Sequence, residues 1–537
     1  MCTSVKNKED DDTCKDVLEM SRKVSLDCLK WLFVQVHMIF DFLVDILFGF
    51  YYDSKAQKVP PVKNDLLLLS ATELADKIRT KKVTSLEVVT AFIERAKEVN
   101  GLINAVVEDR FSDALEEAKE VDKLLEKSQN VDEIKKEKPF LGVPFTTKES
   151  NEAKGMLHTM GLTNRRDYRS PEDATVVNLL KKAGGILIAK TNIPELNLWT
   201  ESRNNLYGQT CNPYNTTRNV GGSSGGEAAI TAACGTAISI GSDIGGSTRM
   251  PAFFNGVFGH KPTEGLTPLK GVGLRKVDYS NSMAEAGPIC KKAEDLAPFL
   301  KVLIGEKVSL LQLDTSVDIK KLKFFYQESS GDLRASKVDS EMKTALLKAV
   351  YHLKEVTGSA TKIRIPGSEY SYRLWRFWMS EENLDFKLSI TNGQYRARAV
   401  SEIYKLLTGK CELTLAAIMK LIDEDLLPKD NPVWAKNVTA NMKKYLLDKL
   451  GDDGVLLYPS SPFPASYHYT AYLRPFNFGY WCLFNILRLP TCQVPLGLDK
   501  DGLPVGVQVV AAPYNDHLCL AVAQELEKAF GGWVQPA

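Results

Sequence analysis

Two short clusters rich in glycine and serine carry the clearest chemical signal in the sequence. They are residues 221–226, Gly-Gly-Ser-Ser-Gly-Gly, and residues 241–249, Gly-Ser-Asp-Ile-Gly-Gly-Ser-Thr-Arg. Because glycine has no Cβ, such segments can adopt unusual backbone conformations and direct successive N–H groups at one point, as an oxyanion requires. The alternatives are a flexible turn and a phosphate-binding loop. The phosphate loop is disfavoured, because neither cluster contains GK[ST] or a complete G-x-G-x-x-G after a strand.

The first cluster also fits the G-x-S-x-G pattern of a nucleophile elbow, centred on Ser224 or, one residue earlier, on Ser223. An elbow must follow a buried strand, whereas residues 209–219 are polar and contain Pro213. Six histidines could still supply a triad partner. This interpretation therefore stays open only as a minor alternative.

A third segment, residues 142–150, places Lys148 after a short apolar stretch and two threonines. A buried lysine has a lowered pKa and can act as a base at neutral pH, whereas an exposed lysine with a pKa of about 10.4 cannot. Taken alone, Lys148 is better explained as a surface residue. The three segments together change that interpretation.

The combination resembles the amidase signature family. Lys148 and Ser223 are 75 residues apart, and Ser247 follows 24 residues later. Residues 190–196, 259–263 and 502–508 are also similar to the family, and the resemblance extends from about Leu67 to the end of the chain. It implies an α/β fold with a large twisted mixed β-sheet covered by helices on both faces.

The resemblance also implies roles for individual residues. Ser247 would be the nucleophile, Ser223 the bridging proton carrier on a cis peptide bond after Gly222, and Lys148 the base. The implied oxyanion hole consists of the backbone N–H groups of Ile244, Gly245, Gly246 and Ser247. Ser224, Asp243 and Arg249 would hold the two loops together, either as part of the catalytic set or through ordinary loop hydrogen bonds and an ion pair. No cofactor and no metal are expected.

The resemblance is strongest to the branch of the family that hydrolyses fatty-acid amides, on residues 247–256 and on Glu227. Thr248 and Asn197 depart from that branch, which puts substrate preference in doubt more than chemistry. We therefore expect a serine hydrolase that cleaves a lipid amide through an acyl-enzyme. The alternatives are an amidase of small soluble amides or an amidotransferase A-type subunit, and a catalytically idle membrane scaffold.

The N-terminal region predicts attachment to a membrane. We expect a polar tail over residues 1–25, a hydrophobic anchor helix over 26–53 and a linker over 54–63. On a helical wheel Lys30, His37, Asp41 and Asp45 fall in one sector. Burying each aspartate at mid-bilayer would cost about 2.5–3.5 kcal/mol, which favours an interfacial helix, or one that packs its polar stripe on a partner, over a spanning helix. A helix buried in the protein's own core is the remaining alternative.

Composition sets the broader class. The formal net charge is +1, which gives no reason to expect nucleic acid as a partner. Helical patterns alternate with short apolar runs such as 185–189 and 507–511, which indicates one α/β catalytic domain over residues 64–537. The ten cysteines are scattered without a C-x-x-C pair and are expected to be reduced, which favours an intracellular membrane. The sequons at Asn215 and Asn437 leave a secretory lumen open, and a homodimer is also left open. The aromatic-rich segment 370–379 is interpreted as a buried helix face in preference to the lining of an acyl channel.

Overall fold

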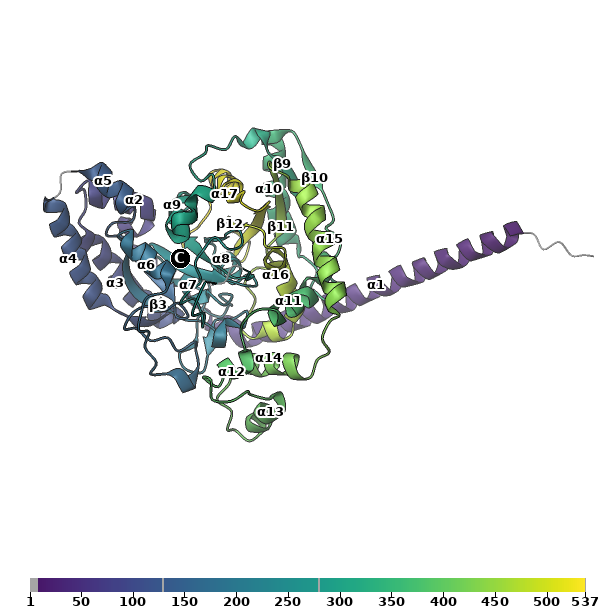
Figure 1. Cartoon of the computed structure of the whole chain (residues 1–537). Helices are drawn as coiled ribbons and strands as arrows, with labels where there is room; N and C mark the ends of the chain where they lie inside the picture. Colours follow the sequence, from purple (N-terminus) through teal and green to yellow (C-terminus); the bar gives the residue numbers. More distant parts are fainter. Residues whose placement is uncertain (1–7, 128–129, 279–280, 537) are drawn as a thin grey trace, which may run out of the picture.

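An eleven-stranded mixed β-sheet forms the centre of the molecule (Figure 1). The structure, a computed structural model, describes residues 8–127, 130–278 and 281–536. Parallel pairs join β2 to β3 and β6, and β9 to β10 and β11, while the other neighbours are antiparallel. In sheet order the strands are β1 (Val106–Asp109), β3 (Ile186–Thr191), β2 (Pro144–Lys148), β6 (Ile238–Asp243), β8 (Glu285–Cys290), β7 (Phe258–Lys261), β12 (Thr491–Leu498), β13 (Pro504–Ala511), β11 (Gly454–Pro459), β9 (Lys323–Tyr326) and β10 (Ala360–Lys362). A separate two-stranded sheet pairs β4 (Arg203–Asn204) with β5 (Gly208–Gln209).

Helices cover both faces of the sheet. They are α2 (Ala71–Arg79), α3 (Ser85–Ile103), α4 (Phe111–Lys127), α5 (Val131–Glu137), α6 (Thr175–Lys182), α7 (Gly225–Ala232), α8 (Arg249–Phe254), α9 (Leu296–Ile304), α10 (Ser340–Thr357), α11 (Ser371–Ser380), α12 (Phe386–Ser389), α13 (Ala399–Leu407), α14 (Leu415–Asp425), α15 (Pro432–Leu450), α16 (Gly479–Ile486) and α17 (Asp516–Phe530). The capping boxes that the sequence predicts at Ser70 and Thr84 are both formed, at the starts of α2 and α3.

The strands have hydrophobic side chains on both faces, as expected for a sheet covered on both sides. In β11, Val455 and Leu457 belong to a core that includes α2, α6, α9 and α17, whereas Leu456 and Tyr458 belong to a second core with α11, α15 and α16. The predicted α/β class, and the predicted strands near 185–189 and 507–511, are therefore confirmed.

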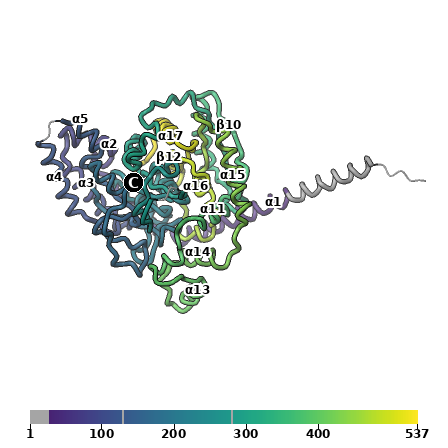
Figure 2. The backbone as a smooth tube through the Cα atoms, viewed as in Figure 1, coloured from purple at the N-terminus to yellow at the C-terminus, as the bar shows by residue number. Residues whose placement is uncertain are grey.

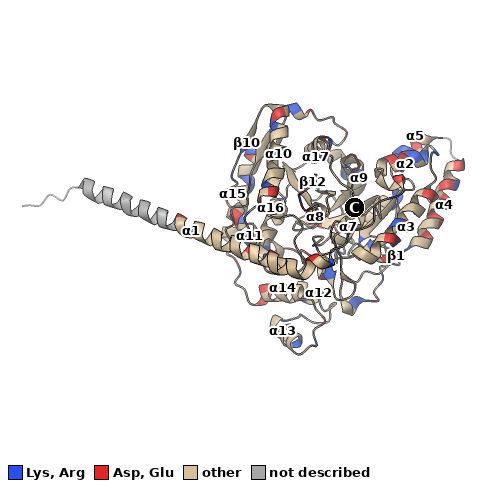
Figure 3. Cartoon of the chain, turned by 180° about the vertical axis from the view of Figure 1, so that it is seen from behind, with Lys and Arg blue, Asp and Glu red and all other residues tan. Residues whose placement is uncertain are grey.

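A single long helix, α1 (Lys8–Tyr52), precedes the body of the molecule. It begins within the segment expected to be a polar tail and ends next to the predicted boundary at residue 53. Its N-terminal part projects from the body (Figure 1), and its C-terminal part lies along the body (Figure 2). Seen from behind, the part of α1 that is not drawn grey carries few Lys, Arg, Asp or Glu residues (Figure 3). By length and composition alone, the helical segment Asp27–Lys55 could cross a membrane.

Candidate active site

The three residues singled out by the sequence meet at one edge of the central sheet. Lys148 is the last residue of β2, and Ser247 lies in the loop that joins β6 to α8. Since β2 and β6 are parallel neighbours, their carboxyl ends lie at the same edge. Ser223 precedes α7, and Ser224 N–H donates to the Ser247 carbonyl oxygen at 3.1 Å, which ties the two serine loops together. Ser223 and Ser247 both line a small cavity of about 80 Å³.

Lys148 is fully buried and contacts two serines. Its Nζ lies 2.7 Å from Ser223 Oγ, 3.0 Å from Ser242 Oγ and 3.4 Å from the Ser242 carbonyl oxygen. Burial lowers the pKa of Lys148 to about 8, against the opposing attraction of Glu227 and Asp243. At pH 7 about a tenth of the lysine is then a neutral amine, far more than for an exposed lysine.

Glu227, on the first turn of α7, opposes the lowering of the Lys148 pKa only where its own carboxyl is ionised. Burial raises the pKa of this carboxyl to about 8, although the charge of Lys148 acts in the opposite direction. At neutral pH Glu227 is therefore mostly protonated, and a protonated carboxyl offers little charge to stabilise an ammonium group nearby.

The backbone around the serines has the features that the glycine clusters predict. The Gly222–Ser223 peptide bond is cis, which confirms the expectation for this bond. A Cβ at Gly222 would lie 2.2 Å from the Trp199 carbonyl oxygen, so no other residue fits there. Gly246 has φ 110° and a Cβ there would lie 2.3 Å from Trp481 Cβ, so this position also requires glycine.

Asp243 and Arg249 form a fully buried ion pair that organises the second serine loop. Arg249 Nε lies 3.1 Å from Asp243 Oδ2, and the guanidinium also donates to Gln508 and Asn485. Burial alone would raise the pKa of Asp243, but the charge and hydrogen bonds of Arg249 outweigh burial and hold that pKa well below its usual range. Ser224 Oγ lies within 3.4 Å of the Ser242 backbone, which links the first loop to β6.

One of the four N–H groups expected in the oxyanion hole has an acceptor within the protein. The Gly246 N–H donates to Asp243 Oδ1 at 2.7 Å and is already occupied by that strong, charge-assisted bond. The N–H groups of Ile244, Gly245 and Ser247 have no acceptor among the described residues. The sequence could not show this, because the direction of one N–H depends on how the Asp243 side chain folds back.

Trp375 of α11 contributes to the same loop. Its Nε1 donates to the Ile244 carbonyl oxygen at 3.1 Å. In a trans peptide the carbonyl and the N–H point in opposite directions, so this bond fixes the direction of the Gly245 N–H. Sequence analysis missed this role because Trp375 lies far along the chain in a segment that resembles a core helix.

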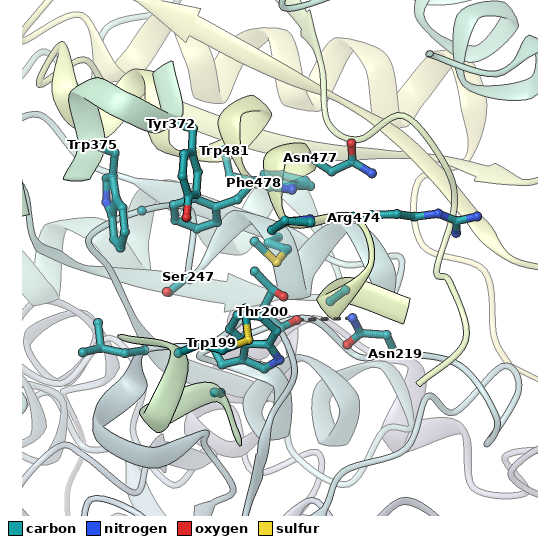
Figure 4. A pocket seen from close by; sticks show the side chains of 18 of the residues that line it. Trp199, Thr200, Asn219, Ser247, Tyr372, Trp375, Arg474, Asn477, Phe478 and Trp481 are labelled. Atoms are coloured by element: carbon teal, nitrogen blue, oxygen red, sulfur yellow. Dashed lines mark hydrogen bonds between the residues drawn. The ribbon is translucent and has the colours of Figure 1, made fainter. Parts of the chain in front are cut away.

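Ser247 also borders a larger cavity with a volume of about 370 Å³ (Figure 4). Its lining is mainly apolar and comes from segments far apart in the sequence: Trp199, Met250, Phe254, Trp375, Phe478 and Trp481. The interpretation of residues 370–379 as a buried helix face is only partly right. Leu374 and Phe377 are buried in the core, whereas Tyr372 and Trp375 line the cavity.

Comparison with known proteins agrees with these features. The amidase family profile matches residues 87–520. Human fatty-acid amide hydrolase 2 is 46% identical over 494 residues, which cover 90% of this chain and 93% of that protein. Fatty-acid amide hydrolase 2-A of Danio rerio is 44% identical over 488 residues, covering 89% and 92%. A solved structure of fatty acid amide hydrolase shares the fold, with a TM-score of 0.70 at 23% identity over 88% of this chain and 86% of that chain.

Proposed function

Since the chain belongs to the amidase family and is an amide hydrolase, we propose that it cleaves fatty-acid amides to a fatty acid and an amine. The single observation that carries the proposal is a buried lysine of lowered pKa, 2.7 Å from a serine hydroxyl, beside an apolar cavity that a second serine borders. The names of the similar proteins support the same substrate class. We propose that residues 64–537 form the catalytic domain.

In this mechanism Lys148 acts as the base in its neutral form. A neutral amine has two N–H donors and one lone pair. The Ser242 carbonyl can only accept a hydrogen bond, so it takes an N–H, and Ser242 Oγ is placed to take the other. The lone pair is then available to the hydroxyl hydrogen of Ser223.

The proton is transferred in two steps. Ser223 gives its proton to Lys148 and receives the proton of Ser247 as Ser247 Oγ attacks the amide carbon. When the tetrahedral intermediate collapses, the C–N bond breaks and the proton returns through Ser223 to the leaving amine. Water, deprotonated by the same route, then hydrolyses the acyl-enzyme and releases the fatty acid.

An oxyanion forms when Ser247 attacks the amide and again when water attacks the acyl-enzyme. Each time it needs hydrogen-bond donors that are already in position. We propose the N–H groups of Ile244, Gly245 and Ser247 for this role. Each such donor typically contributes about 2.7–4 kcal/mol to lowering the barrier. The ion pair of Asp243 and Arg249 and the Ser224 hydrogen bonds would hold these groups in place.

We further propose that α1 attaches the enzyme to a membrane. The exposed apolar side chains of this helix support membrane association. The described cysteines are all free, which is typical of a protein facing a reducing compartment and favours an intracellular membrane.

The test is the Ser247→Ala variant, assayed on a long-chain acyl amide in vesicles and on a short amide in buffer. We expect turnover of both to disappear while circular dichroism stays unchanged, and a fluorophosphonate probe to label the wild type at Ser247 only. Full activity of Ser247→Ala would refute the assignment. Efficient hydrolysis of only the short amide would instead favour a small soluble substrate.

A further inference from the structure

The polar stripe of α1 is bound by one arginine of the catalytic body. Arg474 Nε lies 2.8 Å from Asp41 Oδ1, and its Nη1 lies 2.9 Å from Asp45 Oδ1. The third nitrogen, Nη2, donates to the Asp41 carbonyl oxygen at 2.6 Å. The Arg474 side chain is only 3% exposed, so separating it from both aspartates would leave a buried charge without a partner, which is strongly unfavourable.

A second group of contacts lies at the C-terminal end of the same helix. The Tyr52 ring stacks on the Tyr467 ring at 5.8 Å, and Tyr467 donates a hydrogen bond to Asp53 at 2.6 Å. Gly49 is buried next to Asp53 and Tyr467, and a Cβ there would lie 3.3 Å from the Tyr467 hydroxyl. The docked segment therefore runs from Asp41 through the end of α1 to Asp53, the next residue.

Docking of this segment leaves too little apolar helix to cross a bilayer. Residues 28–40 precede the Asp41 contact and rise about 20 Å at 1.5 Å per residue. A hydrocarbon core is about 30 Å thick. A spanning helix of about 20 residues would need about seven residues of the docked segment as well. These include Asp41 and Asp45, which would first have to leave Arg474.

Outside the polar stripe, the described surface of α1 is strongly apolar and exposed over most of its circumference. Trp31 is 65%, Leu47 66% and Phe50 85% exposed, and the other large exposed apolar side chains are Leu29, Leu32, Phe33, Val36, Met38, Ile39, Phe40, Phe42, Leu43, Ile46 and Tyr51. A helix with one charged edge held on a protein and one broad apolar face fits the boundary between headgroups and acyl chains. The occupant of this face is then a lipid surface.

Arg474 also connects α1 to the large cavity. It lines the same cavity as Ser247. In Figure 4 its side chain lies to the right of Trp375 and Tyr372. Its guanidinium carbon lies 4.9 Å from the centre of the Phe463 ring, and Phe463 lines this cavity too. A movement of α1 that breaks the Arg474 contacts would therefore alter the cavity wall.

We propose that α1 lies in the membrane surface as an interfacial helix held by Arg474, and that this Arg474 contact couples the helix to the cavity that admits the acyl chain. The coupling to substrate rests on the proposed function, whereas the position of α1 does not. Two experiments therefore test the two halves separately.

The first experiment locates residue 30, which lies on the polar stripe near the free end of the apolar segment. Lys30→Cys is made in a Cys28→Ser background, bound to sealed vesicles with the catalytic body outside, and treated with a membrane-impermeant maleimide. Peptide mass spectrometry should find residue 30 labelled as fast as a Lys63→Cys control in the exposed linker. Protection of residue 30 until detergent is added would show that α1 spans the bilayer and would overturn the proposal.

The second experiment breaks the Arg474 contacts. The Asp41→Asn, Asp45→Asn double variant should raise KM for a long-chain amide in vesicles about tenfold, a change of about 1.4 kcal/mol, while kcat for a short amide in buffer stays unchanged. Asp27→Asn, at the exposed start of the segment, is the matched control and should leave both values unchanged. An unchanged long-chain KM in a double variant with wild-type circular dichroism would overturn the coupling. If the wild type hydrolysed no amide, the proposed function would fail, and the labelling experiment would still decide the position of α1.

Discussion

The contact between Lys148 and Ser242 gives a quantitative test of the lysine base. Ser242→Ala removes the hydroxyl 3.0 Å from Lys148 Nζ and leaves Ser223 in place. A hydrogen bond from a charged donor contributes about 1.5–3 kcal/mol, and one between neutral groups contributes about 0.5–1.5 kcal/mol. The ammonium form therefore loses about 1–1.5 kcal/mol more than the amine form, which is about one pKa unit.

The direction of the pKa change follows from which form of Lys148 the lost hydrogen bond favours. Losing a bond that favours the charged form lowers the pKa of Lys148, so the neutral base is present at lower pH. The midpoint of the acidic limb of kcat/KM, about 8 in the wild type, should fall to about 7 in Ser242→Ala. The activity at pH 7, relative to the alkaline plateau, should rise from about a tenth to about a half.

The assay is initial-rate hydrolysis of a soluble amide from about pH 6 to about pH 10. Ser239→Ala is the matched control, because Ser239 lies on the same strand and its hydroxyl bonds Thr146 and Thr231 instead of Lys148. This control should keep the wild-type midpoint. A midpoint in Ser242→Ala that stays at its wild-type value, or moves to higher pH, would refute Lys148 as the neutral base.

Two further predictions concern the residues that hold the second serine loop. Trp375→Phe keeps an aromatic ring but removes the hydrogen bond to the Ile244 carbonyl. We expect kcat to fall about tenfold with little change in KM, a smaller fall in kcat than the loss of an oxyanion donor causes. A change confined to KM would mean that Trp375 acts only as cavity lining. Arg249→Met leaves Asp243 buried without its cation, which should lower the free energy of unfolding in urea at neutral pH by about 3–5 kcal/mol. A decrease below about 1 kcal/mol, typical of exposed ion pairs, would contradict a structural role for this pair.

The chemistry could be predicted from the sequence because it lies in contiguous motifs. The glycines at 222 and 246 are required by close approaches of Trp199 and Trp481, and the cis bond falls within the same cluster. The family resemblance then supplied the roles of Lys148, Ser223 and Ser247. Ser242 was missed although it lies inside a motif, because nothing local indicates that its side chain points to Lys148.

The cavity and the docking of α1 could not be predicted in the same way. Trp375, Phe478 and Trp481 have the local pattern of core residues, and only the tertiary fold turns them toward Ser247. The helical wheel did predict that Asp41 and Asp45 share one edge of a helix that prefers an interface or a partner. It could not identify Arg474, more than four hundred residues away, as that partner.

The base and the acyl cavity have a common physical cause. Lys148 has a low pKa because burial removes water from it, and the larger cavity beside Ser247 has a mainly apolar wall. An apolar wall suits an acyl chain for the same reason that burial suits an uncharged lysine, because neither needs hydration. A preference for lipid amides therefore places little extra demand on a fold whose catalytic base already requires an apolar environment.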